Sequence, residues 1–373
     1  METRELEEDR VLLRLNLGPQ HPSTHGVFRA IVTLEGETIV DLEPVVGYLH
    51  RNHEKIYEHL QYPMIVPFTD RLDYLSAINN ELGYVLAVEG ALGIEVPERA
   101  RVLRVLFSEF QRILYYQLFF GTLAMDLGAT TPFLLAFRDR ERGYDLMERV
   151  TGARLLYNYL RIGGLRNDVP DGWLRDLEAY LDYFEREAWP QYMDLLLRNE
   201  IFLLRTKEVG VLPSDLALAY GASGPVLRGS GIPRDLRKDD PYSGYENFQF
   251  EIPVGERGDS YDRCVVRLYE MLESIRIIRQ ALSRLPDGPV MGQLPRGLLK
   301  LPPGEYYQRV EAPSGELAYY LVSDGGPAPY RAKIRSPSFV HLQLMPHLCR
   351  GHKLADVIVI LSSIFPVFGE VDR

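Results

Sequence analysis

Alternation of apolar and polar residues near the start of the chain predicts a small antiparallel β-sheet. Every second residue is apolar across 11–17, which is the period of a strand with one buried face. Segments 27–34 and 38–42 flank a Glu-Gly-Glu turn, so we expect them to pair as a hairpin. The loop at 18–26 contains two prolines and two glycines, which exclude a helix or a continuous strand there.

Helical periodicity dominates the middle of the chain. Asp70 is a candidate cap for the first of these helices, and Pro97 is placed where a second helix should begin. The third is expected to end at a Gly-Gly pair. The expected helices span about 70–90, 97–120, 140–160, 173–199 and 262–285.

The remainder of the chain predicts a mixture of strands and helix. Residues 286–303 are rich in proline and glycine and are typical of a connection. Two strand-like segments, 316–322 and 330–334, are separated by the turn at 323–326. A short helix is expected at about 354–364.

These patterns together predict an α+β fold in three parts. We expect a small N-terminal β lobe (1–46), a large helical bundle (47–285) and a mixed α/β C-terminal lobe (286–373). The 373 residues are ample for one large domain or several lobes. No apolar run approaches the roughly 18 residues of a membrane-spanning helix, and the acidic N-terminus does not resemble a signal peptide.

Composition narrows the possible functions. A net charge of −10 argues against nucleic-acid binding, which needs a basic surface. Cys264 and Cys349 are the two cysteines and form no CxxC pattern, so the chain by itself cannot hold an iron–sulfur cluster. The 23 tyrosines mildly favour a role as a subunit, because tyrosine is enriched at interfaces.

Two groups of histidines are candidate metal sites. His21 and His25 lie four residues apart, but Pro22 between them prevents the helix that would bring them together. Spacing alone favours a turn histidine satisfied by backbone over a functional histidine at a loop tip. The histidines and glutamates of 50–59 do not match the HExxH pattern, and a solvated or subunit-facing helix explains them better.

Other polar residues have both a structural and a functional interpretation. Asp126 interrupts the apolar segment 121–127 and is either a helix-end residue near solvent or a carboxylate held against a histidine. Tyr74 carries no signal by itself. A basic group surrounds the Gly-Ser-Gly sequence at 229–231, matches no phosphate-binding motif and is interpreted as a loop at an interface. Its members are Arg228, Arg234, Arg237 and Lys238.

Short motifs along nearly the whole chain carry a family resemblance. The chain resembles the D subunit, or 49 kDa-type subunit, of respiratory complex I (NADH-quinone oxidoreductase). The motifs that carry it are, in order, GPQHPSTHG (18–26), GYLHR (47–51) with EK (54–55), DRLDYLS (70–76), MDLGATTPF (125–133), RIGG (161–164), LRGSG (227–231), DPYSGYE (240–246), GERGDSYDR (255–263), GELAYYLVSDGG (315–326), IRSPSF (334–339) and GEVDR (369–373).

The same family is similar to the large subunit of nickel–iron hydrogenases, which implies a hydrogenase-large-subunit-like fold. Hydrogenases hold their metals with an early and a late CxxC pair. The corresponding segments here are 50–53 and 366–369, and neither contains cysteine. Because that metal centre needs soft thiolate ligands, the resemblance favours the quinone-reducing branch and no metal bound by this chain.

The resemblance implies roles for four residues. His25 and Tyr74 match the residues that bind the two carbonyls of a quinone headgroup, and Asp126 matches the carboxylate that pairs with the histidine. Arg51 matches an arginine close to an iron–sulfur cluster of a partner subunit. Histidine can deliver a proton near neutral pH, and tyrosine is normally a protonated donor.

The implied activity belongs to an assembled complex. The chain would be a peripheral-arm subunit of a proton-translocating NADH:quinone oxidoreductase, on the cytoplasmic side of the inner membrane. Implied partners are the cluster-bearing subunits B and I, the C subunit and the membrane H subunit; NAD, flavin and the clusters bind to partners. A related membrane-bound complex that uses ferredoxin or another donor stays open, as do the quinone type and the pumping stoichiometry. A scaffold that has lost the site is disfavoured, because all three site residues are present together.

Three departures from the family pattern stand out. Leu156 and Tyr116 occupy positions where many relatives carry histidine, and the segment 286–306 is short. The histidine at the Leu156 position lies near the terminal cluster and is linked to the pH dependence of its potential. These departures could mark a divergent complex.

Leucine cannot take up a proton, so we expect weak proton coupling at that cluster. The midpoint potential of the cluster, measured in the assembled complex from acidic to alkaline pH, should change little. A steep dependence of the potential on pH would contradict this expectation.

Overall fold

The N-terminal segment forms the predicted antiparallel sheet. In the computed structural model, which describes residues 2–6, 10–20 and 24–373, four strands pair in chain order. Strand β3 buries every second residue against the core, and the predicted first strand at 11–17 is β2. The predicted first strand and the hairpin are therefore confirmed. The strands are β1 (Glu2–Leu6), β2 (Arg10–Leu17), β3 (Arg29–Glu35) and β4 (Thr38–Val45).

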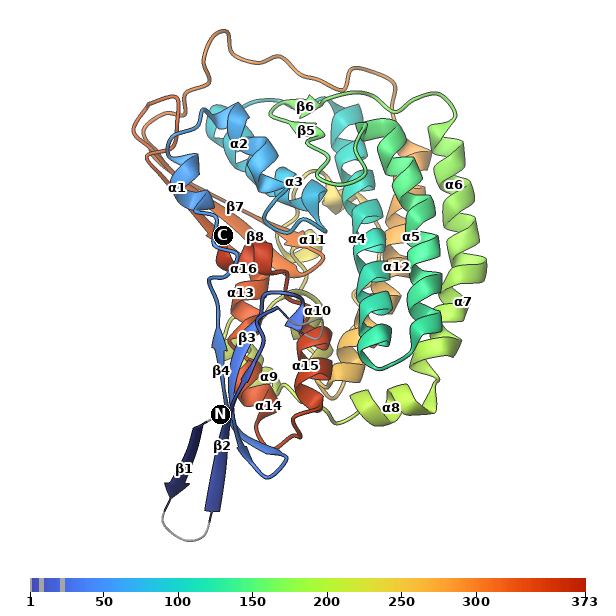
Figure 1. Cartoon of the computed structure of the whole chain (residues 1–373). Helices are drawn as coiled ribbons and strands as arrows, with labels where there is room; N and C mark the ends of the chain where they lie inside the picture. Colours follow the sequence, from blue (N-terminus) through green and yellow to red (C-terminus); the bar gives the residue numbers. More distant parts are fainter. Residues whose placement is uncertain (1, 7–9, 21–23) are drawn as a thin grey trace.

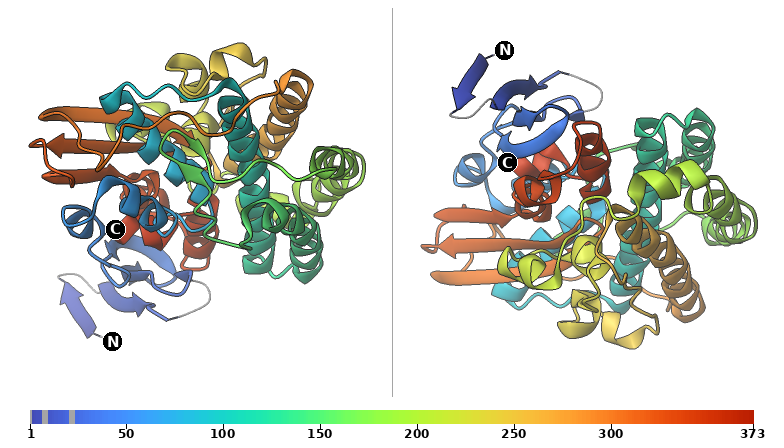
Figure 2. Two further views of the ribbon diagram at one scale, coloured as in Figure 1. Left: turned by 90° about the horizontal axis from the view of Figure 1, so that it is seen from above. Right: turned by 90° about the horizontal axis from the view of Figure 1, so that it is seen from below.

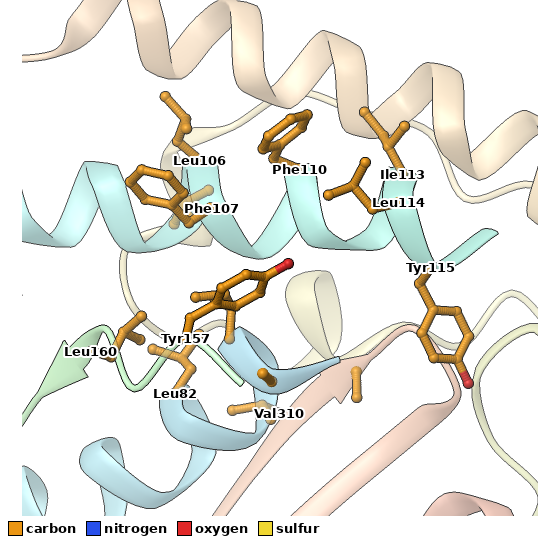
Figure 3. Packing of buried hydrophobic residues seen from close by; sticks show 14 of the residues in the cluster. Leu82, Leu106, Phe107, Phe110, Ile113, Leu114, Tyr115, Tyr157, Leu160 and Val310 are labelled. Carbon is orange, nitrogen blue, oxygen red and sulfur yellow. The ribbon is translucent and has the colours of Figure 1, made fainter. Parts of the chain in front are cut away.

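Long helices form one side of the molecule: α4, α5, α6 and α12 lie side by side on the right of Figure 1, and α3 packs against α4. Helix α4 is buried along most of its length, because its apolar residues point in several directions and its neighbours cover them. Figure 3 shows Phe107 and Phe110 of α4, with Leu82 and Val310 from other elements of the same core. The long helices are α3 (Ala77–Leu92), α4 (Glu98–Asp126), α5 (Thr130–Thr151), α6 (Trp173–Tyr183) and α12 (Ser260–Arg284).

Shorter helices connect and flank these. The predicted helical segment 173–199 continues beyond α6 as two π-helical turns around a short α-helix, and the predicted helix 262–285 is confirmed by α12. The shorter elements are α1 (His53–Tyr57), α2 (Tyr62–Thr69), η2 (Phe184–Ala188), α7 (Trp189–Tyr192), η3 (Met193–Leu197), α8 (Glu200–Thr206), α9 (Ser214–Ala219), α10 (Gly224–Gly229), α11 (Leu236–Asp239), η4 (Tyr245–Asn247), α13 (Pro337–Leu342), α14 (Met345–Cys349), α15 (Asp356–Ile364) and α16 (Phe368–Asp372).

Two predicted helix boundaries are wrong. Asp70 does not cap a following helix: it ends α2, and its carboxylate accepts a hydrogen bond from the distant Asn158 amide at 2.7 Å. The turn at 70–76 separates it from α3. The predicted helix 140–160 is also misplaced, because α5 starts at Thr130 and ends at Thr151, where the following Gly152 stops the α-helix with a φ of 75°.

The C-terminal part adds a second sheet. Strands β7 (Gly304–Ala312), β8 (Gly315–Ser323) and β9 (Arg331–Arg335) pair antiparallel in that order. The last two were predicted, whereas β7 was missed. Gly83 of α3 faces this sheet, and an added Cβ would come within 3.2 Å of Tyr319 and Val310. A small β-hairpin, β5 (Leu160–Arg161) and β6 (Gly164–Leu165), completes the strands of the described residues, so the predicted mixture of helices and small sheets is confirmed.

The two ends of the chain share a hydrophobic core. Buried residues of β3 and β4 pack with α10, α14, α15 and α16 in a cluster separate from the larger core around α4. Both views of Figure 2 place the N-terminal sheet beside the C-terminal helices. Among the described residues, no helix combines the length and the apolar character needed to cross a bilayer.

A buried network of ion pairs joins α10, α11, α12, α4 and β7. Arg228 donates to Glu270 at 2.6 Å and to Glu311 at 2.7 Å. Arg237 donates to Asp235 at 2.6 Å and to Glu109 at 3.0 Å. Burial alone would raise the pKa of the Glu109 carboxyl, but Arg237 and Arg112 offset it and hold the pKa below its usual value.

The interpretation of the basic group as an interface loop is therefore wrong for two of its members. Arg228 and Arg237 are fully buried and neutralise carboxylates inside the fold. The adjacent glycines could not reveal this, because the acidic partners come from residues 42 and 83 positions away from Arg228. Tyr116 joins the same network through a 2.5 Å bond to Glu270.

Arg228→Leu should lower the free energy of unfolding by about 3–5 kcal/mol, because it leaves several buried carboxylates without their cation. Arg309→Leu is the matched control: it breaks a partly exposed pair with Asp240, and we expect a loss of about 1 kcal/mol or less. Denaturant unfolding of the isolated chain measures both. Equal losses in the two variants would contradict a structural role for the network.

Candidate functional site

Three residues singled out in the sequence meet at one pocket. His25, Tyr74 and Asp126 all line a cavity of about 310 Å³. The rest of its wall is mainly apolar and comes from the turn before α3, from α4 and from the segment around the start of α16. Those residues are Leu75, Leu118, Thr122, Met125, Phe365, Pro366, Val367 and Phe368. An apolar cavity with a few convergent polar groups is the usual form of a small-molecule site.

A larger cleft of about 970 Å³ lies elsewhere, between α3, the segment at 240–246 and β7. Two ion pairs in its wall join Arg104 to Glu89 at 2.6 Å and Arg309 to Asp240 at 2.8 Å. The smaller pocket is the better candidate for chemistry, because His25, Tyr74 and Asp126 converge on it.

Local backbone geometry presents each of the three side chains. His25 has a left-handed φ of 50° in the turn that precedes β3, where the Phe28 amide donates to Thr24. Tyr74 belongs to the turn at 70–76 and is 38 % exposed. Asp126 is the last residue of α4, so the helix-end interpretation is confirmed. His21 of the same loop as His25 lies outside the described residues.

Ser362 links the histidine to the carboxylate, and the sequence motifs did not reveal it. The Ser362 hydroxyl donates a hydrogen bond to Asp126 Oδ2. The Ser362 Oγ atom also lies 3.5 Å from His25 Nε2. The link between His25 and Asp126 that the structure describes thus passes through a serine of α15. The only signal in the sequence is a Ser-Ser pair inside an apolar helix.

Burial changes the protonation of these groups. It lowers the pKa of His25 to about 4, against an opposing hydrogen bond to the Pro366 backbone, so the imidazole is neutral near pH 7. Burial raises the pKa of Asp126, and the bond from Ser362 partly offsets this. Burial also raises the pKa of Tyr74, which stays a protonated donor.

Arg51 lies next to this pocket. Its Nη2 donates to the carbonyls of Gly369 at 2.8 Å and Arg71 at 2.5 Å, which ties the chain after residue 50 to the C-terminal segment. A Cβ at Gly369 would lie 2.3 Å from the Leu72 carbonyl oxygen, so this position has room only for glycine. The segments 50–53 and 366–369, far apart in sequence, are therefore neighbours.

The mixed charges of 50–59 have a structural explanation. Glu54 accepts hydrogen bonds from Lys333 and from the Ile334 amide of β9, both at 3.0 Å. This intrachain pairing replaces the expected solvated or subunit-facing role for Glu54. Within the part of the chain that the structure describes, no group of three or more His, Cys, Asp or Glu side chains is arranged to hold a metal ion.

Two further buried carboxyls support the pocket and were not predicted. Asp73 directly precedes Tyr74, and burial together with the nearby Glu370 raises its pKa well above the usual value. Glu370 accepts from the Ser338 amide at 3.1 Å; burial raises its pKa to about 7, against the opposing bonds from Ser338.

Comparison with known proteins assigns a family. A model described as "Respiratory-chain NADH dehydrogenase, 49 Kd subunit" matches residues 126–300 and 293–373. The chain is 54% identical to the D 2 subunit of NADH-quinone oxidoreductase from Symbiobacterium thermophilum, covering 97% of this chain and 98% of that protein. It is 48% identical to the D subunit of the same enzyme from Clostridium beijerinckii (99% and 100%) and 52% identical to that from Geobacillus thermodenitrificans (96% and 98%).

The buried Glu370 should make stability depend on pH. Its folded pKa of about 7 exceeds the ordinary 4.5, so the native state binds this proton more tightly than the unfolded state. Its contribution is complete below about pH 4.5 and is lost as pH rises through 7, a change of roughly 3 kcal/mol at most.

Glu370→Gln should remove most of this dependence, because the side chain is then neutral at every pH. Unfolding of the isolated chain in denaturant at pH 5 and pH 8 measures it. Glu98→Gln, which changes an exposed carboxylate, is the control and should keep the wild-type slope. An unaltered slope in Glu370→Gln would contradict the assignment.

Proposed function

This chain belongs to the family of the 49 kDa subunit of respiratory-chain NADH dehydrogenase, and on that premise we propose that it forms part of a quinone-reduction site. The relatives are named as D subunits of NADH-quinone oxidoreductase, so the activity is that of an assembled oxidoreductase complex. The observation that carries the proposal is the convergence of His25, Tyr74 and Asp126 on one largely apolar pocket.

A quinone headgroup has the chemistry that this pocket suits. Apolar walls accommodate the ring, and its two carbonyl oxygens need hydrogen-bond donors that strengthen as negative charge develops during reduction. We assign one carbonyl to His25 and the other to the Tyr74 hydroxyl. Reduction takes two electrons and two protons; the electrons come from an iron–sulfur cluster of a partner subunit, which we place on the Arg51 side.

The site depends on all three parts of the chain. We propose that the β lobe (1–46), the bundle (47–285) and the C-terminal lobe (286–373) act together, because each contributes to the pocket wall. We also propose a hydrogenase-large-subunit-like architecture in which the contact of 50–53 with 366–369 takes the place of a metal centre. Arg51 and Gly369, which meet there, cannot act as thiolate ligands.

The partners follow from the family. Quinone is the substrate, while NAD, flavin and iron–sulfur clusters are bound by other subunits. We propose contacts with subunits B and I, with the C subunit and with the membrane H subunit, and a peripheral position on the cytoplasmic side of the inner membrane. A donor other than NADH would alter those partners and not this pocket. Genes for a flavin-bearing NADH module beside the gene for this chain would distinguish the two donors.

Tyr74→Phe should lower quinone reduction by the assembled complex by about tenfold or more, because it removes one donor to the developing oxyanion. Assembly should be intact, since the aromatic ring still fills its place. Rates with short-chain quinones measure the effect, and native gels measure assembly. Tyr330→Phe, at a position 69 % exposed, is the control. Normal turnover in Tyr74→Phe would overturn the site assignment.

A further inference from the structure

Helix α15 carries two adjacent serines with different partners. The Ser363 hydroxyl donates to the Ile360 carbonyl at 2.7 Å and accepts from Arg263 at 3.0 Å. The first bond lies within α15, the second holds α15 against α12, and neither reaches the pocket. The Ser362 hydroxyl bonds across the pocket wall to Asp126 and lies 3.5 Å from His25. Serine in a helix commonly bonds back to its own preceding turn. Ser362 instead connects two titratable side chains from separate parts of the chain.

We propose that Ser362 relays a proton between Asp126 and His25 during quinone reduction. The inference rests on the proposed function and deepens it, because it adds a positioning residue that no sequence motif assigned. A hydroxyl suits this role because it can donate one hydrogen bond and accept another at the same time.

The three groups have two matching arrangements. In one, Asp126 is ionised, Ser362 donates to it, and a protonated His25 donates from Nε2 to the Ser362 oxygen. In the other, a protonated Asp126 donates to Ser362, which donates to Nε2 of a neutral His25. Passing from the second to the first breaks the Asp126 O–H and the original Ser362 O–H bonds. It forms a new Ser362 O–H bond and the His25 N–H bond. Two protons each move one step, the net transfer is one proton from Asp126 to His25, and no electrons move.

The surroundings bring the two arrangements closer in energy. A histidine normally holds a proton more tightly than an aspartic acid by about 2.6 pKa units. Burial lowers the pKa of His25 and raises that of Asp126, so this gap narrows. A small gap allows the proton to occupy either end of the relay.

Several charged or titratable groups lie around the relay. Tyr74 lines the same pocket from the turn at 70–76, with the buried Asp73 beside it and Glu370 close to Asp73. Tyr115 of α4 packs on Phe365 of the pocket wall with 5.3 Å between ring centroids, and Arg51 donates to the Gly369 carbonyl.

From α12, Arg267 donates to the Ser363 carbonyl at 2.8 Å and lies over the Phe119 ring, and Arg263 reaches the Ser363 hydroxyl. On the far end of α15, Arg205 of α8 pairs with Asp356 at 3.2 Å.

The direction of transfer follows from exposure. Asp126 is partly exposed at the end of α4, beside Met125, which is 55 % exposed, so it can be reprotonated from water. His25 lines the pocket, so once its Nε2 has taken a proton from Ser362 the imidazolium can release a ring proton to the reduced quinone oxygen and return to the neutral form. The relay therefore resupplies His25 from Asp126 while the quinone covers the pocket.

Ser362→Ala in the assembled complex should lower the rate of quinone reduction on the order of tenfold, because His25 must then be reprotonated from water. The rate should also fall more steeply between pH 6 and pH 9 than in the wild type. Ser362→Thr keeps the hydroxyl and should restore both. Ser363→Ala is the matched control and should keep the wild-type pH profile.

The Ser362→Thr variant is informative only if the larger threonine fits in α15. A double-mutant cycle tests the relay without that requirement. If Ser362 and Asp126 belong to one route, Ser362→Ala, Asp126→Asn and the double variant should have similar rates. Losses that multiply in the double variant, or a wild-type pH profile in Ser362→Ala, would overturn the relay. If the relay is overturned but Tyr74→Phe still lowers the rate, the proposed quinone site is kept and the relay alone is rejected. Normal rates in Tyr74→Phe would overturn the quinone site itself.

Discussion

Burial of charged side chains around α4 is the constraint on which the rest of the structure depends. Where an arginine faces a buried carboxylate, as Arg237 faces Glu109, the carboxyl keeps its charge and joins distant elements into one frame. Where burial outweighs the neighbouring charges and hydrogen bonds, as at Glu370 and Asp126, the carboxyl holds its proton more tightly. Glu109 belongs to the buried network that stabilises the fold, whereas Asp126 lines the pocket and Glu370 follows the pocket wall in the chain. The balance between burial and neighbouring charge therefore differs between these two places.

The pocket is supported by the core around it. Arg51 donates to the Gly369 carbonyl just beyond the pocket wall, and α15, which precedes that wall in the chain, packs against α4 and α12. Among the described residues that line the pocket, the titratable side chains are those of His25, Tyr74 and Asp126. Groups held in place by the surrounding core need little reorganisation when charge develops, which is the general basis of electrostatic catalysis.

Sequence periodicity predicted the elements whose apolar residues follow one face, such as α12 and the N-terminal hairpin. It failed where long-range contacts decide the outcome: Asp70 interacts with Asn158, and not with the helix that follows it. Motifs led to His25, Tyr74 and Asp126. The role of Ser362 was not predicted, because no motif marks a serine in an apolar helix as functional and its partners are 236 and 337 positions away in the sequence. Arg228 was misread because its anions are equally hidden from local sequence patterns.

The close contact at Gly369 also limits how this molecule can be redesigned. A side chain there would collide with the Leu72 carbonyl, in the turn that carries Tyr74, and the Arg51 guanidinium fills the neighbouring space. An engineer who wished to install a metal-binding ligand at this position would have to move that turn and thereby deform the pocket. A metal ligand at this position and the present geometry of the turn that carries Tyr74 are therefore incompatible.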